Sequence, residues 1–310
     1  MSITRRQFLI LTSLTGFGLT ALGKTLGGHT AQSAAGYAIA ANAEEAATIA
    51  SLRLSRPIFR FVSLADTGTG TRGQYAVAEA MTRYHQQHPF DLAILAGDNI
   101  YNSGEIEKIE AVFEKPYQPL LDAGVKFQAC LGNHDIATDN GNPQVKYAGF
   151  NMSGRYYTFR RDSIQFFALD TNYNADWKTQ LPWLEKELSS SDAPWKIVFG
   201  HHPVYSAGLH GASKQLKQIL TPLFEKYNVR LYINGHDHNY ERTRTIKGTT
   251  YLTCGAGAGT RPVGHSEVTA HSVSKLSFAA IDIYPTHILL SGIDKNNQIF
   301  DQGVIFLKPI

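Results

Sequence analysis

The residues able to do chemistry in this 310-residue chain are concentrated in five short segments that combine glycine with Asp, Asn, His or Tyr. Each segment follows an apolar run of strand type: Asp66–Thr67–Gly68, Gly97–Asp98–Asn99–Ile100–Tyr101, Gly132–Asn133–His134, Gly200–His201–His202–Pro203 and Gly235–His236–Asp237–His238. Carboxylate, amide, imidazole and phenol groups are oxygen and nitrogen ligands of metal ions. One such segment alone is typical of a turn or a helix cap, but five in succession predict a metal site.

The pair His236 and His238 is the strongest single feature. In extended backbone, residues i and i+2 point to the same side, so both imidazoles can face one site. Asp237 then points away and suits a supporting hydrogen-bonding role. Two surface histidines in a loop remain the alternative interpretation of this pair.

The elements that must position these segments follow from alternating apolar runs and helical patterns. The pattern predicts strands at 58–65, 92–96, 125–131, 156–160, 164–169, 196–199, 231–234, 249–254, 276–284, 286–292 and 303–307, with helices near 71–88, 104–121, 181–189 and 213–226. Strand–helix–strand repeats followed by a β-rich end favour one α/β domain: two mixed β-sheets packed face to face as a sandwich, with flanking helices. In such sheets, sites form beyond the carboxyl ends of the strands, which is where the five segments fall.

Taken in order, the five segments resemble the DxG, GDxxY, GNH, VxxH and GHxH pattern of the calcineurin-like metallophosphoesterases, and within them of the purple acid phosphatases of the tartrate-resistant type. The match spans residues 66–238. Gly68 stands where many phosphodiesterase relatives carry histidine, and Tyr101 follows Asp98 by three residues. Ala65 replaces a glycine that commonly precedes the first aspartate, a departure that concerns turn packing.

This resemblance implies the metallophosphoesterase fold and a binuclear metal centre of Fe(III) with a divalent ion (Fe, Zn or Mn). Carried over by position, the first metal has the ligands Asp66, Asp98, Tyr101 and His238, and the second has Asp98, Asn133, His201 and His236. Five positive charges from the metals, against two carboxylates, one phenolate and one hydroxide, leave about one net positive charge. That charge suits a phosphate monoester, which a metal-bound hydroxide would attack.

A proton donor for the leaving group is needed, and three histidines compete for that role. His134 is the first choice because it follows Asn133, His210 is the second because the resemblance places a substrate-facing histidine in its loop, and His202 is the third. For each of the three, a structural role is the alternative. Asp170, at another strand end, is expected to hold loops by hydrogen bonds.

The sequence thus predicts an enzyme, a secreted acid phosphatase that acts on small-molecule phosphate monoesters as a monomer. A phosphodiesterase or nucleotidase of the same family is one alternative, and a non-catalytic metal- or phosphate-binding protein is another. Retention of His134 and His210 beside the ligands disfavours the binding protein. No basic run or aromatic–basic cluster indicates a nucleic-acid partner.

The net charge of +3 belongs to the N-terminus. Residues 1–43 contain Arg5, Arg6 and Lys24 and no acidic residue, which leaves 26 basic and 26 acidic side chains in residues 44–310. Paired arginines before a short apolar run resemble a twin-arginine export signal. We therefore expect a signal peptide over 1–43, a catalytic domain over 44–310, contact with the export machinery, and a periplasmic or secreted mature protein that is not membrane-bound. An uncleaved anchor or a disordered basic tail is the alternative.

For two remaining features of the sequence, the cysteines and a glycine–alanine run, we expect a structural role only. Cys130 and Cys254 are expected to be buried free thiols, with a single disulfide as the alternative. The run Gly255–Ala256–Gly257–Ala258–Gly259 lacks the helix that a dinucleotide-binding loop must open, so a flexible loop near the site is expected.

Overall fold

Two mixed β-sheets form the frame of residues 56–307, the part of the chain that this computed structural model describes. The first sheet has the order β13 (Ile299–Phe306), β12 (His287–Asp294), β11 (Ser277–Ile283), β1 (Phe59–Leu64), β2 (Leu92–Leu95) and β3 (Lys126–Ala129). The second has the order β10 (Thr269–Val273), β8 (Tyr240–Thr243), β9 (Thr250–Cys254), β7 (Val229–Asn234), β6 (Trp195–Phe199), β5 (Ile164–Ala168) and β4 (Tyr157–Arg161). The predicted fold class is confirmed.

The main hydrophobic core lies between the two sheets. In β1, Phe61 belongs to this core, whereas Val62 and Leu64 pack in a second cluster on the opposite face. Because successive side chains of a strand point to opposite faces, a strand buried on both sides is apolar throughout. The last four residues of β1, Phe61–Leu64, are buried, and all of them except Ser63 are apolar, in keeping with the central place of the strand in its sheet.

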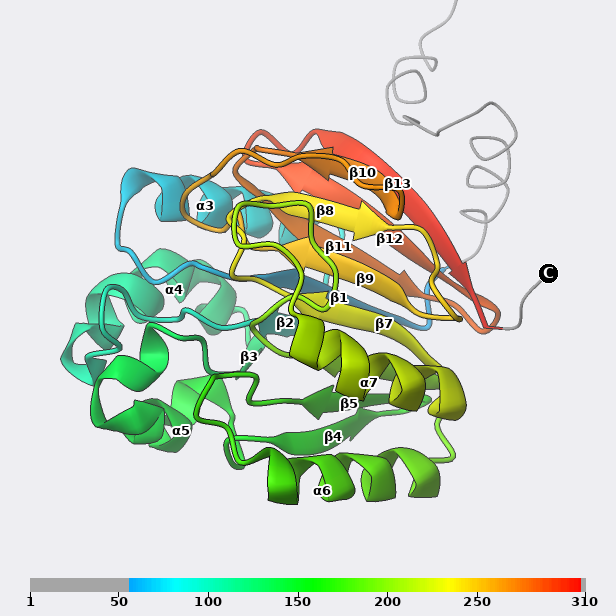
Figure 1. Cartoon of the computed structure of the whole chain (residues 1–310). Coiled ribbons are helices and arrows are strands. Elements are labelled where there is room, and N and C mark those ends of the chain that lie inside the picture. The colour runs from blue at the N-terminus through cyan, green and yellow to red at the C-terminus, as the bar shows by residue number, and fades with distance from the viewer. Residues whose placement is uncertain (1–55, 308–310) are drawn as a thin grey trace, which may run out of the picture. The chain divides into compact units, whose positions relative to one another are not determined.

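Helices cover the outer faces of the sheets (Figure 1). Buried side chains of α3 (Arg72–Gln87) and α4 (Lys115–Asp122) pack on the first sheet, and those of α6 (Trp177–Ser190) and α7 (Lys214–Tyr227) pack on the second. Helix α7 begins where the hydroxyl of Ser213 accepts a hydrogen bond from the Leu216 N–H. This N-cap satisfies one of the backbone donors that a helix start leaves free.

Some elements differ from the prediction. The single helix expected near 104–121 is divided into a 3₁₀ turn (Ile106–Lys108), a π-helical segment (Glu110–Glu114) and α4, with Pro116 and Pro119 in α4. Proline cannot donate the backbone bond that a continuous helix needs. Strands β8 and β10 and the short helix α5 (Asn142–Lys146) were not predicted, because the two strands bury polar side chains and show no apolar alternation.

The parallel strands of both sheets bring their carboxyl ends together. Strands β1, β2 and β3 are parallel to one another, and so are β5, β6, β7 and β9. The Ala65 N–H, directly after β1, donates to the carbonyl of Cys254 at the end of β9, with an N···O distance of 3.0 Å. The loops that follow seven strands therefore meet at one place.

Other expectations have mixed outcomes. Cys130 and Cys254 are buried free thiols, as predicted. The predicted signal segment over residues 1–43 lies outside the described residues, and so does its boundary with the catalytic domain. Within residues 56–307, no helix combines the length and apolarity needed to cross a membrane.

Candidate metal centre

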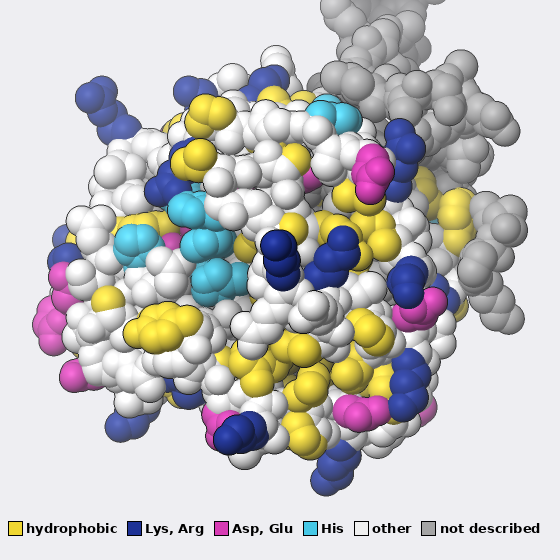
Figure 2. Space-filling view, in the orientation of Figure 1, with side chains coloured by type: hydrophobic (Ala, Val, Ile, Leu, Met, Phe, Trp, Pro, Cys, Tyr) yellow, Lys and Arg dark blue, Asp and Glu magenta, His cyan; other side chains and the backbone are white. Residues whose placement is uncertain are grey.

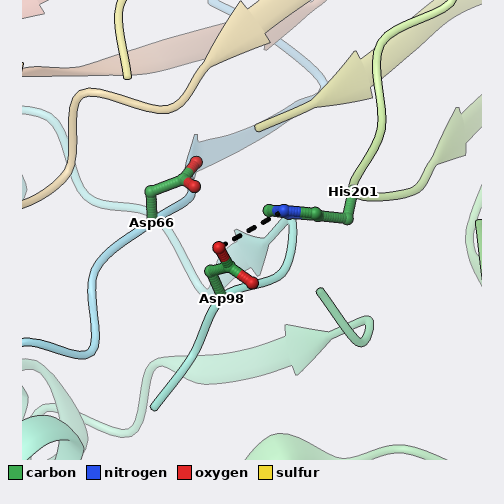
Figure 3. Close-up of side chains that lie close together, drawn as sticks. All are labelled: Asp66, Asp98 and His201. Atoms are coloured by element: carbon green, nitrogen blue, oxygen red, sulfur yellow. Dashed lines mark ion pairs between the residues drawn. The ribbon is translucent and has the colours of Figure 1, made fainter. Parts of the chain in front are cut away.

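The seven side chains predicted to bind metal lie where the strand ends of the two sheets meet. They come from the loops after β1 (Asp66), β2 (Asp98 and Tyr101), β3 (Asn133), β6 (His201) and β7 (His236 and His238). Asp66, Asp98 and His201 are buried and each offers one ligand atom, and these three atoms lie within 4.8 Å of one another. Figure 3 shows the three side chains converging from different loops. The arrangement is a buried cluster able to hold a cation.

A first donor group consists of Asp66, Asp98, Tyr101 and His238. The Tyr101 hydroxyl lies 3.1 Å from Asp66 Oδ1, 2.9 Å from Asp98 Oδ2 and 3.1 Å from His238 Nε2. His238 Nε2 also lies 3.3 Å from Asp66 Oδ1. Four potential ligand atoms thus surround one point, and three of them are oxygens, which suits a hard cation.

A second donor group consists of Asp98, Asn133, His201 and His236. His201 Nε2 lies 3.4 Å from Asp98 Oδ2, 3.1 Å from Asn133 Oδ1 and 3.3 Å from His236 Nδ1. The other ring nitrogen of His201 donates to the Ala96 carbonyl at 3.0 Å, so Nε2 is the nitrogen that can bind a metal ion once its proton is displaced. Asp98 is the residue that the two groups share.

Three of the ten non-glycine residues with positive φ in the described part of the chain belong to the donor groups. Asp66, Asp98 and His236 adopt φ values of 57°, 53° and 71°, a left-handed region that costs such residues on the order of 1–3 kcal/mol each. Glycines make the close packing possible: a Cβ on Gly132 would lie 2.2 Å from Asp98 Oδ1, and one on Gly235 would lie 2.4 Å from Asp66 Oδ2. Strain of this kind typically accompanies function.

The electrostatics of the cluster favour a bound cation. Burial opposes ionisation of Asp98, but the His201 imidazole beside it holds the pKa of this carboxyl below its usual value. Burial likewise disfavours a charged His201, but Asp98 raises its pKa to about 10. Burial, together with the carboxylates of Asp66 and Asp98, raises the pKa of the Tyr101 phenol far above its usual value. In the metal-free chain, protonated His201 and the proton of the Tyr101 phenol lie beside the carboxylates of Asp66 and Asp98. A bound cation would take the place of these protons.

His236 and His202 are kept neutral. Burial, reinforced by the neighbouring His201, lowers the pKa of His236 to about 2 and that of His202 to about 3. A neutral imidazole is the form that binds a metal ion, so His236 is suited to the second donor group.

The three histidines considered as proton donors occupy different positions. His134 Nε2 lies 4.0 Å from Asp98 Oδ2, and its side chain is 35% exposed. The His202 ring contacts the His236 ring at a centroid distance of 4.5 Å, and its Nδ1 lies 3.0 Å from the Thr171 hydroxyl. The exposed His210 ring lies 4.3 Å from the His236 ring. Histidine side chains gather on one part of the surface in the view of Figure 2.

Several supporting residues were not identified from the sequence. Buried Asp135 accepts hydrogen bonds from the backbone of Asn99, Ile100 and Gly132, and so ties the loops after β2 and β3 together. The Thr171 hydroxyl accepts from the backbone N–H groups of His201 and His202, at 3.1 and 2.9 Å. The only indications in the sequence were their positions, next to Asn133–His134 and Asp170.

Two aspartates play the supporting parts predicted for them. Asp237 turns away from the donor groups and accepts from the Ser206 hydroxyl and the His210 N–H, at 2.5 and 2.8 Å. Asp170 accepts from the side chain of Arg155 and from the backbone of Asn172. Both carboxylates therefore hold loops at the edge of the site.

The glycine–alanine run differs from its prediction. Residues 255–258 are buried, and the Gly257 N–H donates to the Ala65 carbonyl at 3.2 Å. A Cβ on Gly255 would lie 2.6 Å from Asp66 Oδ2. The segment expected to be a flexible loop is instead buried and packs against Asp66 of the first donor group. Its small residues allow the ends of β1 and β9 to approach closely.

The two-sheet sandwich thus carries, at its strand ends, a buried cluster of side chains able to hold a metal ion. The sequence matches the calcineurin-like phosphoesterase family over residues 59–240, more than half of the chain, so the chain belongs to this family. It is 31% identical to purple acid phosphatase 7 of Arabidopsis thaliana, over 64% of this chain and 70% of that protein. It is 28% identical to tartrate-resistant acid phosphatase type 5 of Mus musculus, over 65% of this chain and 73% of that protein.

Two solved structures share the fold. One is the purple acid phosphatase PPD1 from yellow lupin seeds, with a TM-score of 0.71 and 20% identity over 81% of this chain and 54% of that one. The other is GAP50, described as the anchor in the inner membrane complex of Plasmodium, with a TM-score of 0.71 and 21% identity over 81% and 89%. The family and the acid phosphatase relatives support an enzyme that hydrolyses phosphoesters.

Proposed function

We propose that the chain is an exported acid phosphatase that hydrolyses phosphate monoesters at a centre of Fe(III) and a divalent ion (Fe, Zn or Mn). The convergence of two four-residue donor groups on Asp98 carries this proposal. The Tyr101 oxygen in the first group favours a hard trivalent ion there, with the divalent ion in the second group. When bound, two such ions hold phosphate oxygens and acidify a water molecule.

The leaving group needs a proton donor, and the candidates are the histidines around the donor groups. His134 Nδ1 lies 2.5 Å from the Asn102 carbonyl and donates to it, which turns Nε2 toward Asp98 and toward an entering phosphate ester. His210 Nε2 accepts from Arg261, since a guanidinium only donates, so this nitrogen carries no proton to give. His202 is held behind His236 and orients it. We therefore assign the proton donor to His134.

Replacing His134 with alanine tests this assignment. We expect kcat on an alkyl phosphate such as glycerol 2-phosphate to fall by about 10²-fold or more, a typical contribution of a general acid. Loss on p-nitrophenyl phosphate should be smaller, because p-nitrophenolate leaves without a proton. His265→Ala, an exposed histidine bonded to Ser272, serves as the control. Equal losses on the two esters would contradict a proton-donating role.

The proposed reaction is tested with the wild-type protein. We expect turnover of p-nitrophenyl phosphate at acidic pH to exceed that of bis(p-nitrophenyl) phosphate, to stop on removal of metal by a chelator, and to return when metal is restored. A higher rate on the diester would favour a phosphodiesterase. Because one structure with this fold is described as an anchor, hydrolysis of neither ester would favour a binding protein.

We further propose that residues 1–43 direct export through the twin-arginine route and that residues 44–310 act as a periplasmic or secreted monomer. The charge distribution supports this, since Arg5, Arg6 and Lys24 account for the whole net charge of +3 and residues 44–310 have no net charge. Export of an already folded chain would allow the metal centre to be loaded before secretion.

A further inference from the structure

Arg261 is a positively charged side chain at the edge of the donor groups, and the function proposed above uses it only as a donor to His210. Its guanidinium donates to His210 Nε2 at 2.5 Å, and its backbone N–H donates to the His238 carbonyl at 2.7 Å. Arg155 and Arg242 pair with buried aspartates, whereas among residues 56–307 no carboxylate lies within ion-pair distance of Arg261. The charge of Arg261 is therefore available to a ligand.

The loop that carries Arg261 is fixed in place. It follows β9 and forms an isolated antiparallel bridge between Val263 and Gly208, and the Gly264 N–H donates to the Ala207 carbonyl at 2.9 Å. The opposite loop is held in turn by buried carboxylates: Glu241 accepts from the Ala207 N–H at 2.7 Å, and Asp237 accepts from the His210 N–H. The guanidinium is thus held at a defined position.

The order of side chains shows what Arg261 can reach. His236 belongs to the second donor group, and the His210 ring lies against it at a centroid distance of 4.3 Å with an interplanar angle of 34°. Nε2 of the same His210 ring accepts from Arg261. The His210 imidazole thus contacts both a member of the second donor group and the guanidinium. An ester whose transferred phosphoryl group sits on the donor groups would meet Arg261 with its leaving group.

We propose that Arg261 is a specificity-determining residue that binds a second anionic group, carried on the leaving-group side of the phosphate ester. The inference rests on the proposed phosphatase function and names the substrate class: esters and anhydrides with a further phosphate or carboxylate, of which a diphosphate is the simplest. A guanidinium matches such groups with two parallel N–H···O bonds. One N–H of Arg261 donates to His210, and no carboxylate competes for the remaining N–H groups, which leaves them free for the substrate.

The test compares substrates with and without that second anion. We expect Arg261→Gln to lower kcat/KM for inorganic pyrophosphate by about 10- to 100-fold, the value of a charge-assisted hydrogen bond. For p-nitrophenyl phosphate the loss should stay below about fivefold, as for an exposed charge. Arg261→Lys should recover part of the pyrophosphate activity. Arg161→Gln is the matched control. It also removes one positive charge, but Arg161 pairs with Ile164 at the start of β5, the end of that strand away from the donor groups.

Phosphoglycolate, which carries a carboxylate as its second anion, shows which anion Arg261 binds. If Arg261→Gln lowers kcat/KM for pyrophosphate alone, the second anion is a phosphate. If it lowers kcat/KM for both substrates, the class includes carboxylates. Equal losses on pyrophosphate and p-nitrophenyl phosphate would overturn the inference. Binding provides a readout without turnover. Calorimetry should show that Arg261→Gln weakens the binding of imidodiphosphate more than the binding of inorganic phosphate. Equal weakening of the two would also overturn the inference. Wild-type hydrolysis of p-nitrophenyl phosphate tests the phosphatase function separately.

Discussion

Replacing Asp98 with alanine is expected to empty both metal positions and to lower kcat/KM by at least about 10³-fold. Asp98 Oδ2 lies 2.9 Å from the Tyr101 hydroxyl and 3.4 Å from His201 Nε2, so one oxygen serves both donor groups. Its other oxygen accepts the His134 N–H at 3.0 Å and so places the assigned proton donor. Even a residue that only orients a metal ligand contributes roughly 10–100-fold to metal affinity, and a shared ligand contributes more.

Metal analysis by mass spectrometry, alongside turnover of p-nitrophenyl phosphate, measures this effect. Asp170→Asn is the matched control, because Asp170 is equally buried at a strand end but pairs with Arg155 and contacts neither donor group. The control should keep both metals. Asp98→Ala should still fold, since without this carboxylate burial favours a neutral His201 and no unpaired buried charge is left. Retention of two tightly bound ions in Asp98→Ala would show that Asp98 does not bridge them.

The fold was predictable because its strands are buried on both faces. Runs such as Leu92–Leu95 are apolar throughout, and their spacing with helical patterns indicates a parallel sheet. Strand β8 could not be predicted in this way. It buries Glu241, whose carboxylate accepts from the Ala207 N–H and the Thr269 hydroxyl. Its burial is stabilised by partners distant in sequence, which local pattern does not reveal.

The candidate site was predictable for a related reason. Its side chains follow parallel strands directly, and the position of a strand end can be inferred from the strand itself. The contact of Arg261 with His210 depends instead on two loops that meet through the bridge of Gly208 and Val263. Loop-to-loop contacts of this kind have no periodicity, so neither Arg261 nor Thr171 could be assigned in advance. The ligand roles of the two donor groups stay a prediction that metal analysis must test.

Tyr101 shows most directly what a bound metal changes. In the metal-free chain, burial and the carboxylates of Asp66 and Asp98 raise the pKa of the phenol, so the side chain is neutral and the protein is expected to be colourless. A trivalent ion between the same carboxylates reverses this balance, because its charge outweighs theirs and stabilises the phenolate. Addition of Fe(III) should therefore produce a visible tyrosinate-to-iron charge-transfer band.

Tyr101→Phe is expected to abolish that band completely while iron stays bound through Asp66, Asp98 and His238. The phenyl ring keeps the packing against His134, whose ring lies 4.5 Å away, so loss of colour reports the missing oxygen alone. Tyr157→Phe is the control, since this buried tyrosine donates to the Ala129 carbonyl away from the donor groups. Absorption spectra with iron quantification measure the effect. Colour that persists in Tyr101→Phe would assign the chromophore to another tyrosine and remove the argument for a trivalent ion in the first donor group.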